Sequence, residues 1–120
     1  MKGIGCDLIE IDRIEHSLNH YGKTFKDKIF TPLEQAYCES KKNPAQHYAV
    51  RFAAKEAVAK ALGCGFGAFL SFHDVEISVD DLGKPFVTLS DQAKKTHSSP
   101  KLHLSLSHSK GLAQAVVLCE

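Results

Sequence analysis

One stretch of the sequence decides how the rest must pack: Arg51-Phe52-Ala53-Ala54-Lys55-Glu56-Ala57-Val58-Ala59-Lys60-Ala61-Leu62-Gly63. It is strongly helical, and at about 100° per residue Glu56 and Lys60 lie about 40° apart on one face, while alanines and valines gather on another. Lys55 falls on the opposite flank. Two interpretations of the Glu56 and Lys60 pair stay open. It is either an exposed ion pair that supports the helix, or a metal ligand beside a lysine that holds a phosphate.

The remaining elements can be read outward from this helix, which begins at Asn43-Pro44 and ends at Gly63. The first half predicts a strand and two further helices, and the second half predicts two pairs of strands joined by a short helix. The short connections favour antiparallel pairing, so the chain is expected to be α+β. The predicted strands are 3–9, 75–79, 85–89, 102–108 and 113–119, and the other predicted helices are 10–19, the stretch after Thr31 and 91–97.

Two polar residues stand out in the predicted strands. Asp7 shares a strand face with Gly5 and Ile9, where a carboxylate loses hydration unless something pairs with it. It is either a strand end or helix cap, or a ligand. His108 ends the alternating run that begins at Leu102, where its serine neighbours would surround an anion with donors, unless it is simply exposed.

The glycines of the loop Gly63-Cys64-Gly65-Phe66-Gly67 would let backbone N–H groups approach a phosphate, but they are also typical of a helix C-cap and a turn. The loop follows a helix, whereas the nucleotide hydrolase and dinucleotide fingerprints follow a strand. Both of those are therefore excluded.

Composition sets the class of protein. A chain of 120 residues is expected to form one domain, spanning residues 1–120, and a net charge of +1 gives no reason to expect nucleic acid or membrane as a partner. Four scattered cysteines lack a Cys-x-x-Cys spacing, so free, mostly buried thiols are expected. With no signal peptide or membrane-spanning run, we expect a cytoplasmic protein.

Four groups of residues in order along the chain carry a family resemblance: Gly5-Cys6-Asp7 with Arg13, Arg51 to Ala57, Lys60 to Gly63, and Ser105-Leu106-Ser107-His108. They resemble the holo-[acyl-carrier-protein] synthases, the small bacterial class of 4′-phosphopantetheinyl transferases. The resemblance implies a curved antiparallel sheet packed on a long central helix. It also implies a homotrimer with active sites between protomers.

The implied reaction moves 4′-phosphopantetheine from coenzyme A to a serine of apo acyl carrier protein, in support of fatty acid biosynthesis. It releases adenosine 3′,5′-bisphosphate and requires Mg²⁺. By resemblance, Asp7 and Glu56 are the catalytic carboxylates that hold Mg²⁺, and Lys60 is the catalytic cation on the pyrophosphate. The acceptor of the serine proton stays open between a carboxylate and a water on the metal.

Other residues match binding positions of the family. The positions around the nucleotide and its 3′-phosphate are occupied by Lys42, Arg51, Ser107 and His108. The loop beside the pyrophosphate contains Gly63 and Gly65. The positions that meet the carrier protein are occupied by Arg13, Phe25 and Phe52. Cys64 stands where the family commonly has threonine, and the segment 41–48 is less typical, so Lys42 is the least secure of the transferred residues.

Two alternative functions use the same residues. A non-catalytic carrier-protein-binding module would keep the fold but would have no need of a Mg²⁺ site. A Mg²⁺-dependent hydrolase of nucleotide diphosphates would need an ordered attacking water in place of a docked serine.

Overall fold

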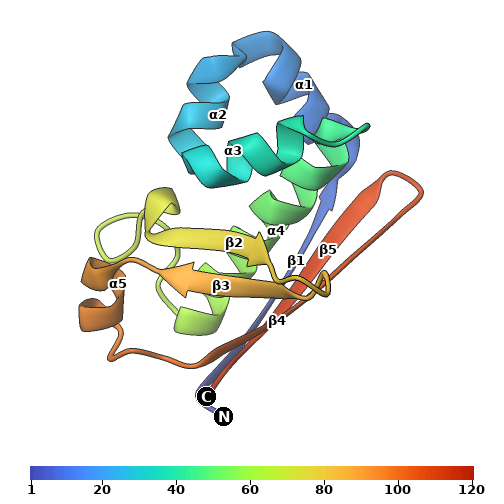
Figure 1. Ribbon diagram of the computed structural model, residues 1–120. Helices are drawn as coiled ribbons and strands as arrows, with labels where there is room; N and C mark the ends of the chain where they lie inside the picture. The colour runs from blue at the N-terminus through green and yellow to red at the C-terminus, as the bar shows by residue number, and fades with distance from the viewer.

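The computed structural model describes all 120 residues and has the long helix α4 (Pro44–Leu62) at its centre (Figure 1). The predicted bounds of this helix are confirmed: it begins after Asn43 and ends at Gly63, which takes a left-handed conformation with φ of 76°. The sequence predicted a single apolar face, but α4 is buried on most sides because small alanines surround its axis. The flank that carries Glu56 and Lys60 remains accessible.

A three-stranded antiparallel sheet covers one side of α4, with the order β1 (Gly3–Glu10), β5 (Leu112–Cys119) and β4 (Leu102–Ser109). A separate hairpin, β2 (Val75–Val79) and β3 (Pro85–Leu89), lies with β3 beside β4 (Figure 1). The expected α+β class, with antiparallel strands packed on a long central helix, is confirmed.

Three helices cover the amino-terminal half of α4: α1 (Ile11–Tyr21), α2 (Lys23–Ile29) and α3 (Pro32–Glu39). The helix predicted after Thr31 is α3, and a capping box starts it, with Glu34 N donating to Thr31 Oγ1 at 3.2 Å and Thr31 N donating to the Glu34 carboxylate at 2.9 Å. The sequence missed α2, whose seven residues are too few for a helical pattern to emerge. It also missed a 3₁₀ turn at Phe72–Asp74, while the short helix α5 (Asp91–Thr96) was predicted.

Two glycines let β1 lie directly on α4. A Cβ at Gly5 would overlap the carbonyl oxygen of Ala57, and a Cβ at Gly3 would overlap that of Ala61. Both obstacles are helix backbone, which cannot turn aside as a side chain can. This close approach sets the distance at which Asp7, two residues beyond Gly5, faces the helix.

A fully buried ion pair joins α3 to α4. Lys55 Nζ lies 2.8 Å from Glu34 Oε1, and neither side chain is exposed. Lys55 also donates to the carbonyl oxygens of Phe72 at 2.9 Å and Val75 at 2.6 Å, while Ile77 N donates to Glu34 Oε2 at 2.7 Å. The prediction that Lys55 lies away from the Glu56 face is confirmed, because its ammonium ties the core together.

Two further expectations concern the cysteines and the membrane. All four thiols are free, but only Cys38 and Cys119 are buried, so the expectation of mostly buried thiols is half right. No helix combines the length and the apolar composition needed to cross a membrane.

Candidate functional site

Asp7 and Lys60 meet where β1 crosses α4. Alternation along β1 turns Asp7 toward the helix, where its side chain is 18% exposed, and Lys60 Nζ reaches its Oδ1 at 3.1 Å. The same ammonium donates to the carbonyl oxygen of Cys6 at 2.9 Å. Lys60 remains 54% exposed and forms no ion pair with Glu56. The interpretation of Glu56 and Lys60 as an ion pair along the helix is therefore wrong, since the partner of Lys60 comes from the first strand.

Glu56 lies half-buried beside this pair. Burial raises the pKa of its carboxyl group, and the negative charge of Asp7 raises it further, while Lys60 acts in the opposite direction. A cation bound beside the two carboxylates would stabilise the ionised form of Glu56.

The composition of this site suits Mg²⁺. Carboxylate oxygens are the hard ligands that this ion prefers, and it is usually held by one or two of them together with substrate phosphates and water. No group of three or more His, Cys, Asp or Glu side chains in the chain is arranged to hold a metal ion. Asp7 and Glu56 would leave most coordination positions to other oxygens.

An aromatic wall borders the carboxylates. Phe52, one helical turn before Glu56, stacks on Phe72 with ring centroids 6.1 Å apart, and Phe72 stacks on Phe66 at 4.0 Å. Phe66 belongs to the glycine loop, so the loop with Gly63 and Gly65 is anchored next to the wall. A functional role was predicted from the sequence for Phe52 but not for Phe66 and Phe72. The recurrence of phenylalanine between residues 66 and 72 was the available signal.

A second cluster forms on another flank of α4. Arg51 is 2% exposed and its guanidinium lies 4.1 Å from the ring centroid of Tyr37. It pairs with no carboxylate, and its Nε has no hydrogen-bond partner, a costly arrangement for a buried cation unless an anion arrives. A cavity of about 200 Å³ opens beside it, lined by Tyr37, His47, Val50, Arg51, Val79, Gly83, Pro85, Leu106 and His108.

Several of these lining residues were missed from the sequence. Asp80 shapes the β2–β3 turn by accepting hydrogen bonds from the backbone N–H groups of Leu82 and Lys84, both at 2.9 Å, and so presents Gly83 and Pro85 to the cavity. The signal was the connection between the predicted strands 75–79 and 85–89, for which no role in binding was predicted from the sequence.

The structure separates some residues that the sequence grouped. His108 lies within β4, which continues to Ser109, and its Nε2 lies 3.0 Å from the amide nitrogen of Gln46. Strand alternation points the side chains of Ser107 and Ser109 to the face opposite the His108 side chain, although all three residues line a common cavity of about 210 Å³. Lys42 is exposed before α4 and makes no hydrogen bond or ion pair.

The residues expected to meet a carrier protein lie toward α1 and α2. Arg13 is exposed on α1, and Phe25 on α2 is half-buried with its ring 6.1 Å from that of Phe30. Phe52 lies instead beside Glu56 in the aromatic wall. Arg13 forms no ion pair with another residue of the chain.

The two clusters lie on different faces of α4 within one chain. Arg51, which lines the cavity, is five residues before Glu56, about 7.5 Å along the helix axis and about 140° around it. The carboxylate site and the cationic cavity therefore open in different directions.

The fold and the two carboxylates place the chain in a known class of transferases. Residues 3–117 match the family described as the 4′-phosphopantetheinyl transferase superfamily, and the chain belongs to that superfamily. Two similar curated proteins are holo-[acyl-carrier-protein] synthases. The protein from Protochlamydia amoebophila is 50% identical, with 94% of this chain and 93% of that protein covered. The protein from Ruminiclostridium cellulolyticum is 47% identical over 93% of this chain and 87% of that one.

Solved structures agree in fold. The Helicobacter pylori holo-[acyl-carrier-protein] synthase in complex with coenzyme A superposes with a TM-score of 0.90 at 36% identity, covering 98% of this chain and 99% of that chain. The Bacillus anthracis enzyme with coenzyme A (3′,5′-ADP) gives a TM-score of 0.85 at 40% identity, covering 98% and 95%. The resemblance seen in the sequence, and the prediction that the chain is an enzyme of this class, are confirmed.

Proposed function

We propose that this chain transfers 4′-phosphopantetheine from coenzyme A to a serine of an apo acyl carrier protein and releases adenosine 3′,5′-bisphosphate. The observation that carries the proposal is the pair of carboxylates, Asp7 and Glu56, converging beside an exposed Lys60 in a chain of this superfamily. The coenzyme A complexes of two similar synthases support the choice of donor.

In this proposal each residue of the carboxylate site has a separate task. Asp7 and Glu56 would hold Mg²⁺, which supplies neutralisation of negative charge on the pyrophosphate. Lys60 is exposed enough to place its ammonium on the same pyrophosphate, where it stabilises the charge that develops on the departing bisphosphate. The serine oxygen attacks the β-phosphorus and gives its proton to a carboxylate or to water. The bond from that phosphorus to the bridging oxygen breaks, adenosine 3′,5′-bisphosphate leaves with that oxygen, and the phosphopantetheine stays on the serine.

The assay that tests the function incubates the protein with coenzyme A, Mg²⁺ and an apo carrier protein, followed by mass spectrometry of the carrier. We expect a phosphopantetheine adduct that depends on Mg²⁺ and one equivalent of adenosine 3′,5′-bisphosphate per adduct. Carrier binding without an adduct would point to the non-catalytic module, and bisphosphate release without carrier would point to the hydrolase. Either outcome would contradict the proposal.

The setting is also a proposal. We place the protein in the cytoplasm, on the basis of its four free cysteines, and in fatty acid biosynthesis, on the basis of its carrier-protein substrate. Arg13, Phe25 and Phe52 are proposed as carrier contacts, with the exposed guanidinium of Arg13 suited to an acidic surface.

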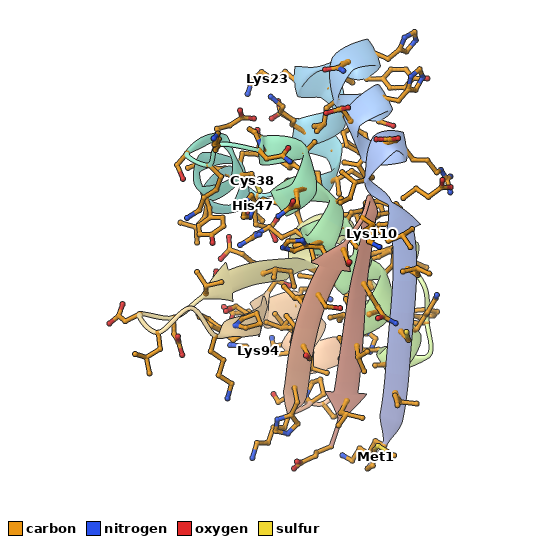
Figure 2. The ribbon with its side chains drawn as sticks, turned by 90° about the vertical axis from the view of Figure 1, so that its right-hand side faces the viewer. Met1, Lys23, Cys38, His47, Lys94 and Lys110 are labelled. Carbon is orange, nitrogen blue, oxygen red and sulfur yellow. The ribbon has the colours of Figure 1, made fainter.

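We further propose that the protein is a homotrimer whose active sites lie between protomers. The sheet face turned away from α4 faces the viewer in Figure 2 and exposes Ile4, Leu8, Leu112 and Leu118 by 39% to 59%. Such a contiguous apolar face is typical of an interaction surface. The carboxylates and the cationic cavity also lie on different faces of α4 within one chain, since Arg51 and Glu56 are about 140° apart around the helix. A second copy would bring its own cavity to the first copy's carboxylates.

Charged substitutions on the open sheet face should therefore disrupt both assembly and activity. The double variant Ile4→Asp/Leu118→Asp is expected to sediment as a monomer and to lose transfer at least tenfold, because buried unpaired carboxylates oppose association. The control Leu82→Asp alters a leucine that is 96% exposed at the β2–β3 turn, and should sediment like the wild type. A wild-type protein that sediments as a monomer while fully active would contradict the trimer.

A further inference from the structure

The short helix α2 depends on its neighbours for its position. Its seven residues are too few to form a stable helix alone, and its N-cap residue, Gly22, supplies no side-chain hydrogen bond. It lies between α1 and α3 at the amino-terminal end of α4 (Figure 1). Contacts with the other helices therefore fix where α2 lies.

Three polar side chains join α2 to α4. Lys26 Nζ on α2 lies 2.7 Å from Glu39 Oε2 at the end of α3, and the same oxygen accepts a hydrogen bond from the Tyr48 hydroxyl at 2.6 Å. Tyr48 belongs to α4 and is fully buried. Lys26, Glu39 and Tyr48 are called the polar bridge below.

A chain of aromatic rings follows the same route. The ring of Phe25 on α2 meets that of Phe30 edge-on with centroids 6.1 Å apart, and the ring of Phe30 lies 4.8 Å from that of Tyr48. Phe30 is fully buried, whereas Phe25 is half-buried and reaches the surface. Both the rings and the polar bridge therefore end on Tyr48.

The polar bridge keeps its charge pattern at neutral pH. Burial, and then the hydrogen bond to Glu39, raise the pKa of the Tyr48 phenol, so this group remains a donor. Hydrogen bonds from Lys26 and Tyr48 lower the pKa of Glu39, so its carboxylate remains an ionised acceptor. Hydrogen bonds to an ionised group are stronger than those between neutral groups.

A cavity of about 240 Å³ opens beside the polar bridge. It is lined by Glu15 and Leu18 of α1, Ala45 of α4 and all three residues of the bridge. This open space gives α2 room to shift if the bridge is lost.

We propose that Tyr48 is a positioning residue that fixes α2, through Glu39 and Lys26, in the place from which Phe25 meets the carrier protein. This inference rests on the proposed function, in which Phe25 is a carrier contact, and deepens it by naming what orients the docking surface. Tyr48 is 0% exposed, so it touches neither the carrier nor the donor.

The test measures kcat and KM for apo carrier protein at saturating coenzyme A, and KM for coenzyme A at saturating carrier. Tyr48→Phe keeps the ring and removes one buried oxygen without altering any surface charge. It should raise KM for the carrier about tenfold and leave kcat and KM for coenzyme A within about twofold, because one hydrogen bond to a charged group is lost. The control Tyr21→Phe removes a phenol oxygen from a side chain that is 59% exposed, and should match the wild type.

A merely structural role for Tyr48 predicts a different pattern. Loss of stability alone would lower the active fraction, and hence kcat, without changing KM for the carrier, and that result would overturn the positioning role. Glu39→Ala, at a side chain that is 48% exposed, keeps the test decisive if Tyr48→Phe does not fold. It should also raise KM for the carrier, whereas the loss of a surface carboxylate would by itself favour an acidic partner.

The double variant Tyr48→Phe/Glu39→Ala shows whether the two residues act through one bridge. Its KM for the carrier should equal that of Glu39→Ala, because the hydroxyl has no role without the carboxylate. Additive effects of the two substitutions would overturn the bridge.

Calorimetry of carrier binding separates this inference from the proposed function. Tyr48→Phe should bind apo carrier about tenfold more weakly than the wild type does. Transfer by the wild type, with equal carrier affinity of the two proteins, would overturn the positioning role alone. Weaker binding by Tyr48→Phe, without any transfer by the wild type, would support the positioning role and overturn the proposed function.

Discussion

Glu56→Gln is expected to lower transfer by a factor on the order of a thousand or more while leaving the protein folded. The amide keeps the shape and burial of the side chain but removes a charged oxygen that would hold Mg²⁺. Transfer is measured as adduct formed on carrier protein at saturating coenzyme A and Mg²⁺. Asp91→Asn, an equivalent change on exposed α5, should retain wild-type activity. Near-normal transfer by Glu56→Gln would contradict the metal assignment.

The same variant should be more stable than the wild type at neutral pH without divalent cations. The folded protein raises the pKa of Glu56 above its ordinary value of 4.5, so ionisation of this group penalises folding. The penalty is absent below pH 4.5, grows as the pH rises, and is complete above the raised pKa. Urea unfolding of Glu56→Gln and wild type should therefore differ at pH 7 and converge toward pH 4, and a gap that widens toward pH 4 would contradict the pKa direction.

Lys55→Ala is expected to cost about 3–5 kcal/mol in the free energy of unfolding. The substitution leaves the buried Glu34 carboxylate without its cation, and it removes one hydrogen bond from each of the carbonyl oxygens of Phe72 and Val75. A domain of this size is stabilised by about 5–15 kcal/mol in total, so the variant should melt at a much lower temperature or fail to fold. Denaturant unfolding followed by circular dichroism measures the loss.

Two variants show whether the ion pair causes that loss. The double variant Lys55→Met/Glu34→Leu removes both charges together and should recover much of the lost stability, since apolar replacements of buried pairs are often tolerated. Lys94→Ala, at an exposed lysine labelled in Figure 2, should change the stability by less than about 0.5 kcal/mol. An equally small effect of Lys55→Ala would mean that the buried pair contributes little.

Much of the fold could be predicted from the sequence because its local signals agreed with one another. Three local signals predicted helix ends correctly: Thr31 before α3, Asn43-Pro44 at the start of α4, and Gly63 at the end of α4. Alternation along β1 correctly placed Asp7 on the inner face of the strand. A carboxylate on that otherwise apolar face was the strongest indication of a functional site.

What could not be predicted depends on which elements meet. Periodicity pairs Lys60 with Glu56 one turn away, but the close approach of β1 through Gly5 gives Lys60 a nearer partner in Asp7. Tyr37 lies on α3, and its contact with Arg51 follows from how two helices cross, which no spacing along the chain reveals.

We propose that one donor molecule is held by the carboxylates of one protomer and by the cationic cavity of another. Subunit complementation tests this most directly, using Glu56→Gln, which lacks the metal ligand, and Arg51→Met, which lacks the buried cation. Each variant alone should be nearly inactive. When they are dissociated, mixed in equal amounts and reassembled, about a quarter of wild-type transfer should return, because one site in four then pairs two intact halves. Mixed assemblies that form but stay inactive would show that both halves come from the same chain, and would contradict the account.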